Sequence, residues 1–340
     1  MMRGHLPRIL RPLVLAVAVG FIGYLVHEVG PATIWDTIRT LSWRLLVVLC
    51  FPYALVATLD TLGLRFAFRR TPPRFGVLFR ARLAGEAVNL TTPTASVGGE
   101  PVKAYLLRAH VPLAEAFAAV IADKTTLVVG QGLFLLIGLL LATLLVPLST
   151  PIMTGMAILL AVEALAVAGF VCVQLRGVLG GGGRFLGRLG LVAGAGYQAG
   201  LDEVDRALTV LYREYADRLL LSVLCHLLGF LAGSLEIYLV LNFLGLPISP
   251  LTALVVESFG TGIRFASFMI PGSLGALEGG NVAIFAAFGL GGALGLTYTL
   301  IRRLREAAWA SVGLSLLAAL GARPAPIAAR GPGEPPAPLC

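Results

Sequence analysis

Apolar residues run in long blocks along most of the chain and are separated by short polar segments. Six blocks approach or exceed the roughly 20 residues that an α-helix needs to cross the hydrocarbon core of a bilayer. The chain is therefore predicted to be an all-α polytopic membrane protein, a class that its mean hydropathy of +0.89 also indicates. The predicted spans are Ile9–Val29, Leu45–Leu64, Thr125–Leu145, Met153–Leu175, Leu219–Leu241 and Ala293–Leu320.

Two further segments combine apolar residues with glycine, proline and charge at positions where a membrane helix normally carries none. The first runs from Ala81 to Leu107 and the second from Glu257 to Asn281. A helix that breaks inside a membrane leaves backbone groups that lipid cannot satisfy, so such breaks are buried in protein or line a wet cavity. Paired broken segments in the two halves of a chain are typical of transporter binding sites. The sequence therefore predicts two re-entrant, broken-helix segments.

Arginine residues are distributed unevenly between the predicted loops. Three lie at residues 3–11 and six at residues 65–82, whereas the loops at 147–151 and 242–250 have none. Because positively charged loops stay in the cytoplasm, both termini are predicted to be cytoplasmic, and the two broken segments then enter the membrane from opposite sides. We expect one membrane domain over residues 1–320 with inverted halves at about 9–147 and 151–320, followed by a disordered cytoplasmic tail at 321–340.

Two short segments have an amphipathic pattern. Trp35–Arg39 predicts a short interfacial helix between the first two spans. In Asp202–Arg218 the charged residues alternate with Val204, Leu208 and Leu211 at helical spacing. This pattern fits a helix that lies on the membrane surface and equally a plain connecting helix.

Charged residues at membrane depth are the candidate functional residues. Each needs a partner or water, because an unpaired charge at the bilayer centre costs about 3 kcal/mol on insertion scales. Internal ion pairs that only hold the helices together would meet the same need. Arg302, Arg305 and Glu306 share one helical face, so a pair between Arg302 and Glu306 would leave Arg303 or Arg305 free. The planar guanidinium of a free arginine suits a phosphate.

The half-helix after Gly98 and Gly99 is a second candidate anion site. Its N–H groups and positive dipole end attract anions, and Lys103 follows one turn later. Glu100 fits four roles here: it caps the helix, repels a phosphate, carries a proton or pairs with an arginine. His226 stands alone on an apolar helix and is interpreted as a packed or hydrogen-bonded core residue. HExxH and GxSxG motifs are absent, so we expect no catalytic residue, metal or cofactor.

The residues of both broken segments resemble a known family. The first segment contains Gly85-Glu86, Asn89, Pro93 and Gly98-Gly99-Glu100 and is followed by Asp123-Lys124; the second contains Glu257, Arg264, Pro271 and Glu278 and is followed by Arg302-Arg303. They are similar to the membrane domain of lysylphosphatidylglycerol synthase/flippase proteins. Over about residues 10–320 the chain most resembles stand-alone members associated with hopanoid biosynthesis. The resemblance implies a multi-pass protein of the bacterial inner membrane that moves or handles an anionic or modified lipid. Because the chain ends at Cys340, the aminoacyl transfer of the bifunctional members is not expected here.

The leading hypothesis is a lipid translocase whose partners are membrane lipids with anionic or polar headgroups. A second copy of the chain and lipid-biosynthesis enzymes are further candidate partners, whereas nucleic acid is not expected, because the basic residues flank apolar spans. The alternatives are a membrane enzyme or assembly factor in hopanoid or polyprenyl-lipid biosynthesis, and a structural partner whose charges form ion pairs. Glu86, Glu100 and Glu278 are candidates for proton coupling. The predicted substrate-binding residues are Glu86, Asn89, Pro93, Gly98, Gly99, Glu100, Lys103, Asp123, Lys124, Glu257, Arg264, Pro271, Glu278, Arg302, Arg303 and Arg305.

Overall fold

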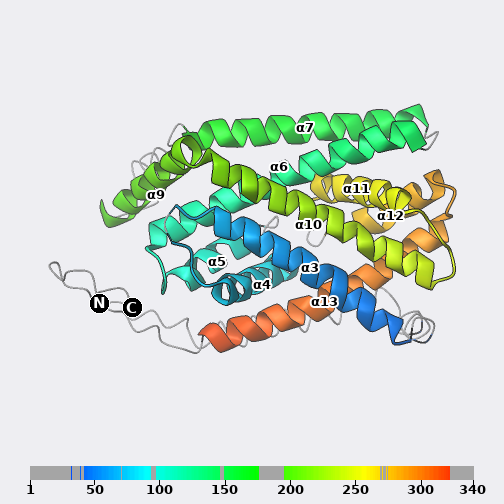
Figure 1. The fold of residues 1–340 in the computed structure, drawn as a ribbon, viewed down its shortest axis with the longest axis horizontal. Helices are drawn as coiled ribbons and strands as arrows, with labels where there is room; N and C mark the ends of the chain where they lie inside the picture. The colour runs from blue at the N-terminus through cyan, green and yellow to red at the C-terminus, as the bar shows by residue number, and fades with distance from the viewer. Residues whose placement is uncertain are drawn as a thin grey trace.

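Long helices that cross one another obliquely make up most of the computed structural model of the chain (Figure 1). The structure describes residues 42–69, 71–92, 97–145, 149–175, 195–268 and 275–321, together with residues 32, 39, 270 and 273. The predicted first span, residues 35–38 of the predicted interfacial helix and the tail after residue 321 lie outside the described residues. The helices are α3 (Arg44–Phe66), α4 (Phe75–Thr91), α5 (Gly99–Leu107), α6 (Leu113–Leu145), α7 (Thr150–Leu175), α9 (Ala195–Glu214), α10 (Ala216–Phe243), α11 (Pro250–Ala266), α12 (Ala276–Ala287) and α13 (Gly292–Gly321).

Four of these helices, α3, α6, α7 and α10, are long and apolar enough to cross a membrane. The prediction of an all-α polytopic membrane protein is confirmed, and the predicted bounds of α3, α7 and α10 are right to within three residues. Helix α6 begins at Leu113, twelve residues before the predicted start, so that Asp123 and Lys124 lie within the helix. Helix α13 has the predicted bounds but is too charged to count among the apolar spans, so its crossing of the membrane stays a prediction.

Each broken segment forms two packed helices, and the described residues between them are not α-helical. Helix α4 ends at Thr91, and Thr92 is extended, as the residue before a proline prefers. Helix α5 packs closely on α4: a Cβ atom on Gly99 would lie 1.9 Å from the carbonyl oxygen of Gly85. In the second pair, α12 begins after Gly275, whose φ of 77° favours glycine and whose N–H donates to the Glu278 carboxylate at 2.7 Å. Both predicted breaks are therefore present.

The two helix pairs lie toward opposite ends of the bundle, and each belongs to its own apolar core (Figure 1). One core joins α4 and α5 to the end of α3, the beginnings of α6 and α10, and α9. The other joins α11 and α12 to the beginnings of α3 and α13 and the ends of α6 and α10. The contacts between halves are reciprocal, because α4 packs on α13 while α11 packs on α6.

Helix α9 accounts for most of the predicted amphipathic segment. It ends at Glu214, and α10 begins two residues later at Ala216, so the segment predicted as one helix to residue 218 is divided. Val204, Leu208 and Leu211 are buried in the core that includes the beginning of α6. The apolar face of α9 is thus covered by protein, which favours the connecting-helix interpretation over a helix that inserts its apolar face into lipid.

Candidate functional site

Two groups of charged residues lie between the apolar cores. We define the first charge cluster as Asp60, Arg82, Glu86, Glu100, Lys103, Asp123, Lys124 and His226, and the second charge cluster as Glu236, Glu257, Arg264, Glu278, Arg302, Arg303, Arg305 and Glu306. Helix α10 contributes His226 to the first cluster and Glu236 to the second. A helix rises 1.5 Å per residue, so these positions are about 15 Å apart along α10, half of the ~30 Å hydrocarbon thickness.

Asn89 borders the first cluster and connects α4 to the beginning of α5. Its side-chain oxygen accepts a hydrogen bond from the Gly99 N–H at 2.7 Å, and its amide donates to Glu100 at 3.3 Å. Gly98 is the N-cap residue of α5. The first N–H of the half-helix is therefore used inside the protein, which weakens the prediction that this helix end by itself forms an anion site.

Arg82 on α4 joins two buried carboxylates from different helices. Its guanidinium donates to Asp60 on α3 at 2.5 Å and lies 3.9 Å from Asp123 on α6. Glu86, one turn along α4, is half-buried and interacts electrostatically with Arg82. Arg82 counted among the arginines that indicated a cytoplasmic loop, and the structure instead places it in the interior. One of the six positive charges at residues 65–82 is therefore no evidence for topology.

The lysines of the first cluster surround Glu100. Lys103 Nζ lies 2.5 Å from Glu100 Oε2 and 3.9 Å from Asp123 Oδ2, and its side chain is buried. Lys124 Nζ lies 3.8 Å from Glu100 Oε1, with 30% of its side chain exposed. The sequence was compatible with a pair between Glu100 and an arginine. The structure instead pairs Glu100 with two lysines, Lys103 and Lys124. Lys124 is the more accessible of these two cations.

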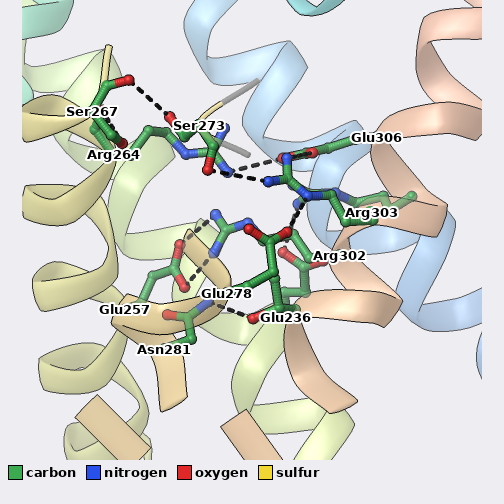
Figure 2. Close-up of polar contacts among 12 residues, drawn as sticks. Glu236, Glu257, Arg264, Ser267, Ser273, Glu278, Asn281, Arg302, Arg303 and Glu306 are labelled. Atoms are coloured by element: carbon green, nitrogen blue, oxygen red, sulfur yellow. Dashed lines mark hydrogen bonds and ion pairs between the residues drawn. The ribbon is translucent and has the colours of Figure 1, made fainter. Parts of the chain in front are cut away.

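The second cluster is arranged around α13, where Arg302 holds Glu257 with two parallel hydrogen bonds (Figure 2). The two nitrogen–oxygen distances are 2.9 and 2.7 Å. The Tyr298 hydroxyl donates to the same carboxylate at 2.8 Å and accepts from Arg302 at 3.0 Å. This bidentate geometry is the strong form of an arginine–carboxylate pair.

The other arginines of this cluster also have carboxylate partners. Arg303 donates to Glu278 and to Glu306, each at 2.9 Å, and Arg264 donates to the other oxygen of Glu306 at 2.9 Å (Figure 2). Arg305 donates to Glu236 at 2.6 Å. The expected pair between Arg302 and Glu306 is therefore wrong, because Glu306 faces two other arginines and Arg302 turns to α11. Neither Arg303 nor Arg305 is left as a free cation.

Pairing still leaves some buried polar atoms of the second cluster unsatisfied. Within the described part of the chain, Nε of Arg302, Nε of Arg305 and Oε1 of Glu236 have no hydrogen-bond partner. Buried N–H donors are usually satisfied by protein, water or ligand. Arg264 is the accessible cation of the cluster, with 37% of its side chain exposed. The cluster thus combines accessible positive charge with unused donor capacity.

The structure brings the predicted site residues together in two places and adds others. Tyr53 on α3 lies beside the second of these places, where the Arg305 guanidinium stacks over its ring at 5.2 Å. Pro93 and Pro271 lie outside the described residues. Sequence reasoning did not place five cluster members in the site: Asp60, Arg82, His226, Glu236 and Glu306. Isolated polar residues on apolar helices were the available signal for three of these, namely Asp60, His226 and Glu236.

Comparison with known proteins matches nearly the whole chain to one family. The model of the family described as "Lysylphosphatidylglycerol synthase TM region" matches residues 11–314. A UPF0104 membrane protein of Methanothermobacter thermautotrophicus (strain Delta H) is 26% identical to the chain over 309 residues, which cover 86% of this chain and 90% of that protein. No solved structure matches the chain.

Proposed function

The chain belongs to the lysylphosphatidylglycerol synthase TM region family of membrane proteins, and from this premise we propose that it is a translocase for an anionic or modified membrane lipid. The observation that carries the proposal is the second charge cluster, where four arginines lie among membrane helices. Two of them have buried N–H donors without an acceptor in the described chain. Phosphate oxygens are suitable acceptors for such donors. We also propose that the protein lies in the bacterial inner membrane with both termini in the cytoplasm, and that it acts in hopanoid metabolism or transport.

Full pairing of the charges determines how a headgroup would bind. The second cluster contains four carboxylates and four arginines, so an anionic head enters by replacing a carboxylate as partner of an arginine. Arg264 is the natural first contact, because it is partly exposed and shares Glu306 with Arg303. In the first cluster the corresponding contact is Lys124. The headgroup would thus have two binding positions, in clusters whose members on α10 lie about 15 Å apart along a path across a ~30 Å hydrocarbon core.

The helix packing supports alternating access. Two broken helix pairs lie toward opposite ends of the bundle, and each packs on a long helix of the other half, α4 on α13 and α11 on α6 (Figure 1). This reciprocity supports the inverted-topology repeat predicted from the sequence. In transporters built from such repeats, one half rocks against the other around a fixed site. The lipid tails would remain in the bilayer throughout.

Reconstitution into liposomes tests the proposal directly. Phosphatidylglycerol, phosphatidylcholine and hopanoid lipids with fluorescent headgroups would be placed in the inner leaflet, and their arrival outside followed with a membrane-impermeant quencher. We expect the protein to speed the movement of anionic lipid, and the Arg264→Gln and Lys124→Gln variants to slow it at least tenfold. Arg206→Gln on α9 is the matched control, because Arg206 is exposed and belongs to neither cluster. Rates equal to those of protein-free liposomes across the whole panel would overturn the proposal.

A further inference from the structure

Three buried side chains from three helices meet at His226. Its Nδ1 lies 2.9 Å from Oδ1 of Asp60 on α3, and its Nε2 lies 3.0 Å from Oδ1 of Asp123 on α6. The side chain of His226 is fully buried, and that of Asp123 is 1% exposed. We propose that these three residues form a proton-binding site in the interior of the membrane domain, with His226 held as an imidazolium between two carboxylates.

The argument comes from hydrogen-bond chemistry. A neutral imidazole has one N–H donor and one bare nitrogen, whereas an ionised carboxylate only accepts. With a neutral ring and two ionised carboxylates, one of the two contacts would therefore place the bare nitrogen of the ring against a carboxylate oxygen, so that two acceptors would repel each other at hydrogen-bond distance. One added proton turns both contacts into charge-assisted hydrogen bonds. Both distances are thus favourable once the three residues share one proton. Arg82 beside both aspartates and Lys103 beside Asp123 favour ionised carboxylates, which leaves the proton on the ring.

The surrounding backbone leaves room for this arrangement. A Cβ atom on Gly63 of α3 would lie 2.7 Å from Nε2 of the histidine, and one on Gly130 of α6 would lie 3.1 Å from its Cβ. A Cβ atom on Gly229, one turn along α10, would lie 2.9 Å from Oδ1 of Asp60. Three helices therefore each supply a glycine where a larger residue would push the ring or its partner away. Within the described residues, no group of His, Cys, Asp or Glu has the geometry of a metal site.

The charges that face the three residues determine what the proton does. Arg82 from α4 contacts both aspartates, and Lys103 from α5 lies 3.9 Å from Asp123. The first charge cluster as a whole contains the carboxylates Asp60, Glu86, Glu100 and Asp123 and the cations Arg82, Lys103 and Lys124. With a neutral histidine the cluster therefore carries one negative charge, and with an imidazolium it is neutral. The proton removes a charge that would repel an anionic headgroup.

Linkage then couples the proton to the lipid, a step that rests on the proposed function. If the proton favours an anionic head in the first cluster, the head favours the proton by the same factor. Lipid movement should therefore be faster at pH 6 than at pH 9. The sign follows from the charge count, because proton loss at high pH leaves the cluster negative.

Nitrogen NMR of the full chain, labelled with ¹⁵N-histidine in nanodiscs, tests the proton site without any transport. The signal that disappears in the His226→Gln variant belongs to this residue, and His110→Gln is the control, because His110 is exposed in the turn after α5. We expect imidazolium shifts for His226 at pH 7.5. In Asp60→Asn, His226 should become neutral at this pH. A neutral His226 ring in the wild-type protein at pH 7.5 would overturn the proposal.

A second measurement separates this proposal from the translocase. Lipid movement in liposomes would be followed at pH 6 and pH 9 for the wild-type protein and for His226→Gln. Movement that is at least fivefold faster at pH 6 in the wild type, and independent of pH in the variant, supports the coupling. An imidazolium seen by NMR together with pH-independent movement refutes the coupling but leaves the proton site. Absence of all lipid movement refutes the translocase and leaves the NMR result to stand by itself.

Discussion

The pair of Glu257 and Arg302 allows a test of whether the buried charges bind lipid or only hold the helices together. Both side chains are largely buried, and two hydrogen bonds of 2.7 and 2.9 Å join them. Removing one member of such a pair leaves a charge without compensation, which typically costs about 3–5 kcal/mol. We expect this loss for Glu257→Gln and for Arg302→Met. The Tyr298 hydroxyl still donates to Glu257 in Arg302→Met, so that variant should lie near 3 kcal/mol.

The double variant with both substitutions should regain most of this stability, because no buried charge is left unpaired. Replacing a complete buried pair by uncharged groups is often neutral or stabilising. Because the double variant should lie close to the wild type, a double-mutant cycle should then give a coupling energy close to the sum of the two single losses, roughly 5–8 kcal/mol. The free energy of unfolding would be measured by denaturant titration in mixed micelles, with Arg206→Gln as the exposed control. Single variants that lose less than about 1 kcal/mol would refute the burial argument, since such small losses are usual for exposed pairs.

Lipid movement by the same four proteins gives the functional answer. If Arg302 contacts the headgroup, the stable double variant remains at least tenfold slower than the wild type, because the cation is gone while the fold is restored. If the pair only holds α11 against α13, the double variant recovers activity together with stability. Recovery of both properties would refute the assignment of Arg302 to the lipid path.

Three other predictions concern single contacts. Gly99→Ala should destabilise the fold by about 2 kcal/mol or more in denaturant titration, because its Cβ would lie 1.9 Å from a backbone carbonyl of α4. Gly76→Ala in α4, where no atom lies within 4 Å of the added Cβ, should not destabilise it. Glu163 is buried, and neither of its carboxylate oxygens has a partner in the described chain. It should therefore be protonated in the bilayer and react with a hydrophobic carbodiimide, and mass spectrometry that finds no labelling in the wild type would contradict this. Tyr212→Phe should speed hydrogen exchange in α9, because it removes a 2.6 Å bond to Gln174 on α7 worth about 1 kcal/mol; unchanged exchange would refute it.

The membrane helices could be predicted because the hydrophobicity of about 20 consecutive residues, summed along the chain, determines whether a segment can span the bilayer. The same reasoning placed the start of α6 twelve residues too late, because the apolar block from Thr125 is preceded by the charged residues Asp123 and Lys124. Asp123 is in fact 1% exposed and lies opposite His226. Sequence alone does not show which face of a helix looks inward, so an internal charge next to an apolar run resembles a membrane boundary.

The partners of the charged residues were harder to predict than the charges themselves. Glycine and proline marked both breaks, and the charges beside them are indeed in the clusters. His226, however, meets aspartates that are 166 and 103 residues away in the chain, and no local pattern indicates such a contact. Arg82 followed a run of cytoplasmic-type arginines, and only the packing of α4 against α3 turns it inward. Spacing predicts neighbours on one helix, whereas pairing between helices depends on the fold.

Complete pairing of the arginines is compatible with a transport site and in one respect favours it. A buried arginine without a partner would be costly in the empty protein, and it would hold a phosphate too firmly for rapid release. In the second charge cluster each arginine already has a carboxylate, and Glu306 is shared between Arg264 and Arg303. A headgroup that displaces Glu306 from Arg264 leaves this carboxylate still paired with Arg303. The exchange therefore leaves no charge unpaired at either end, which keeps binding weak and reversible, as a translocase requires.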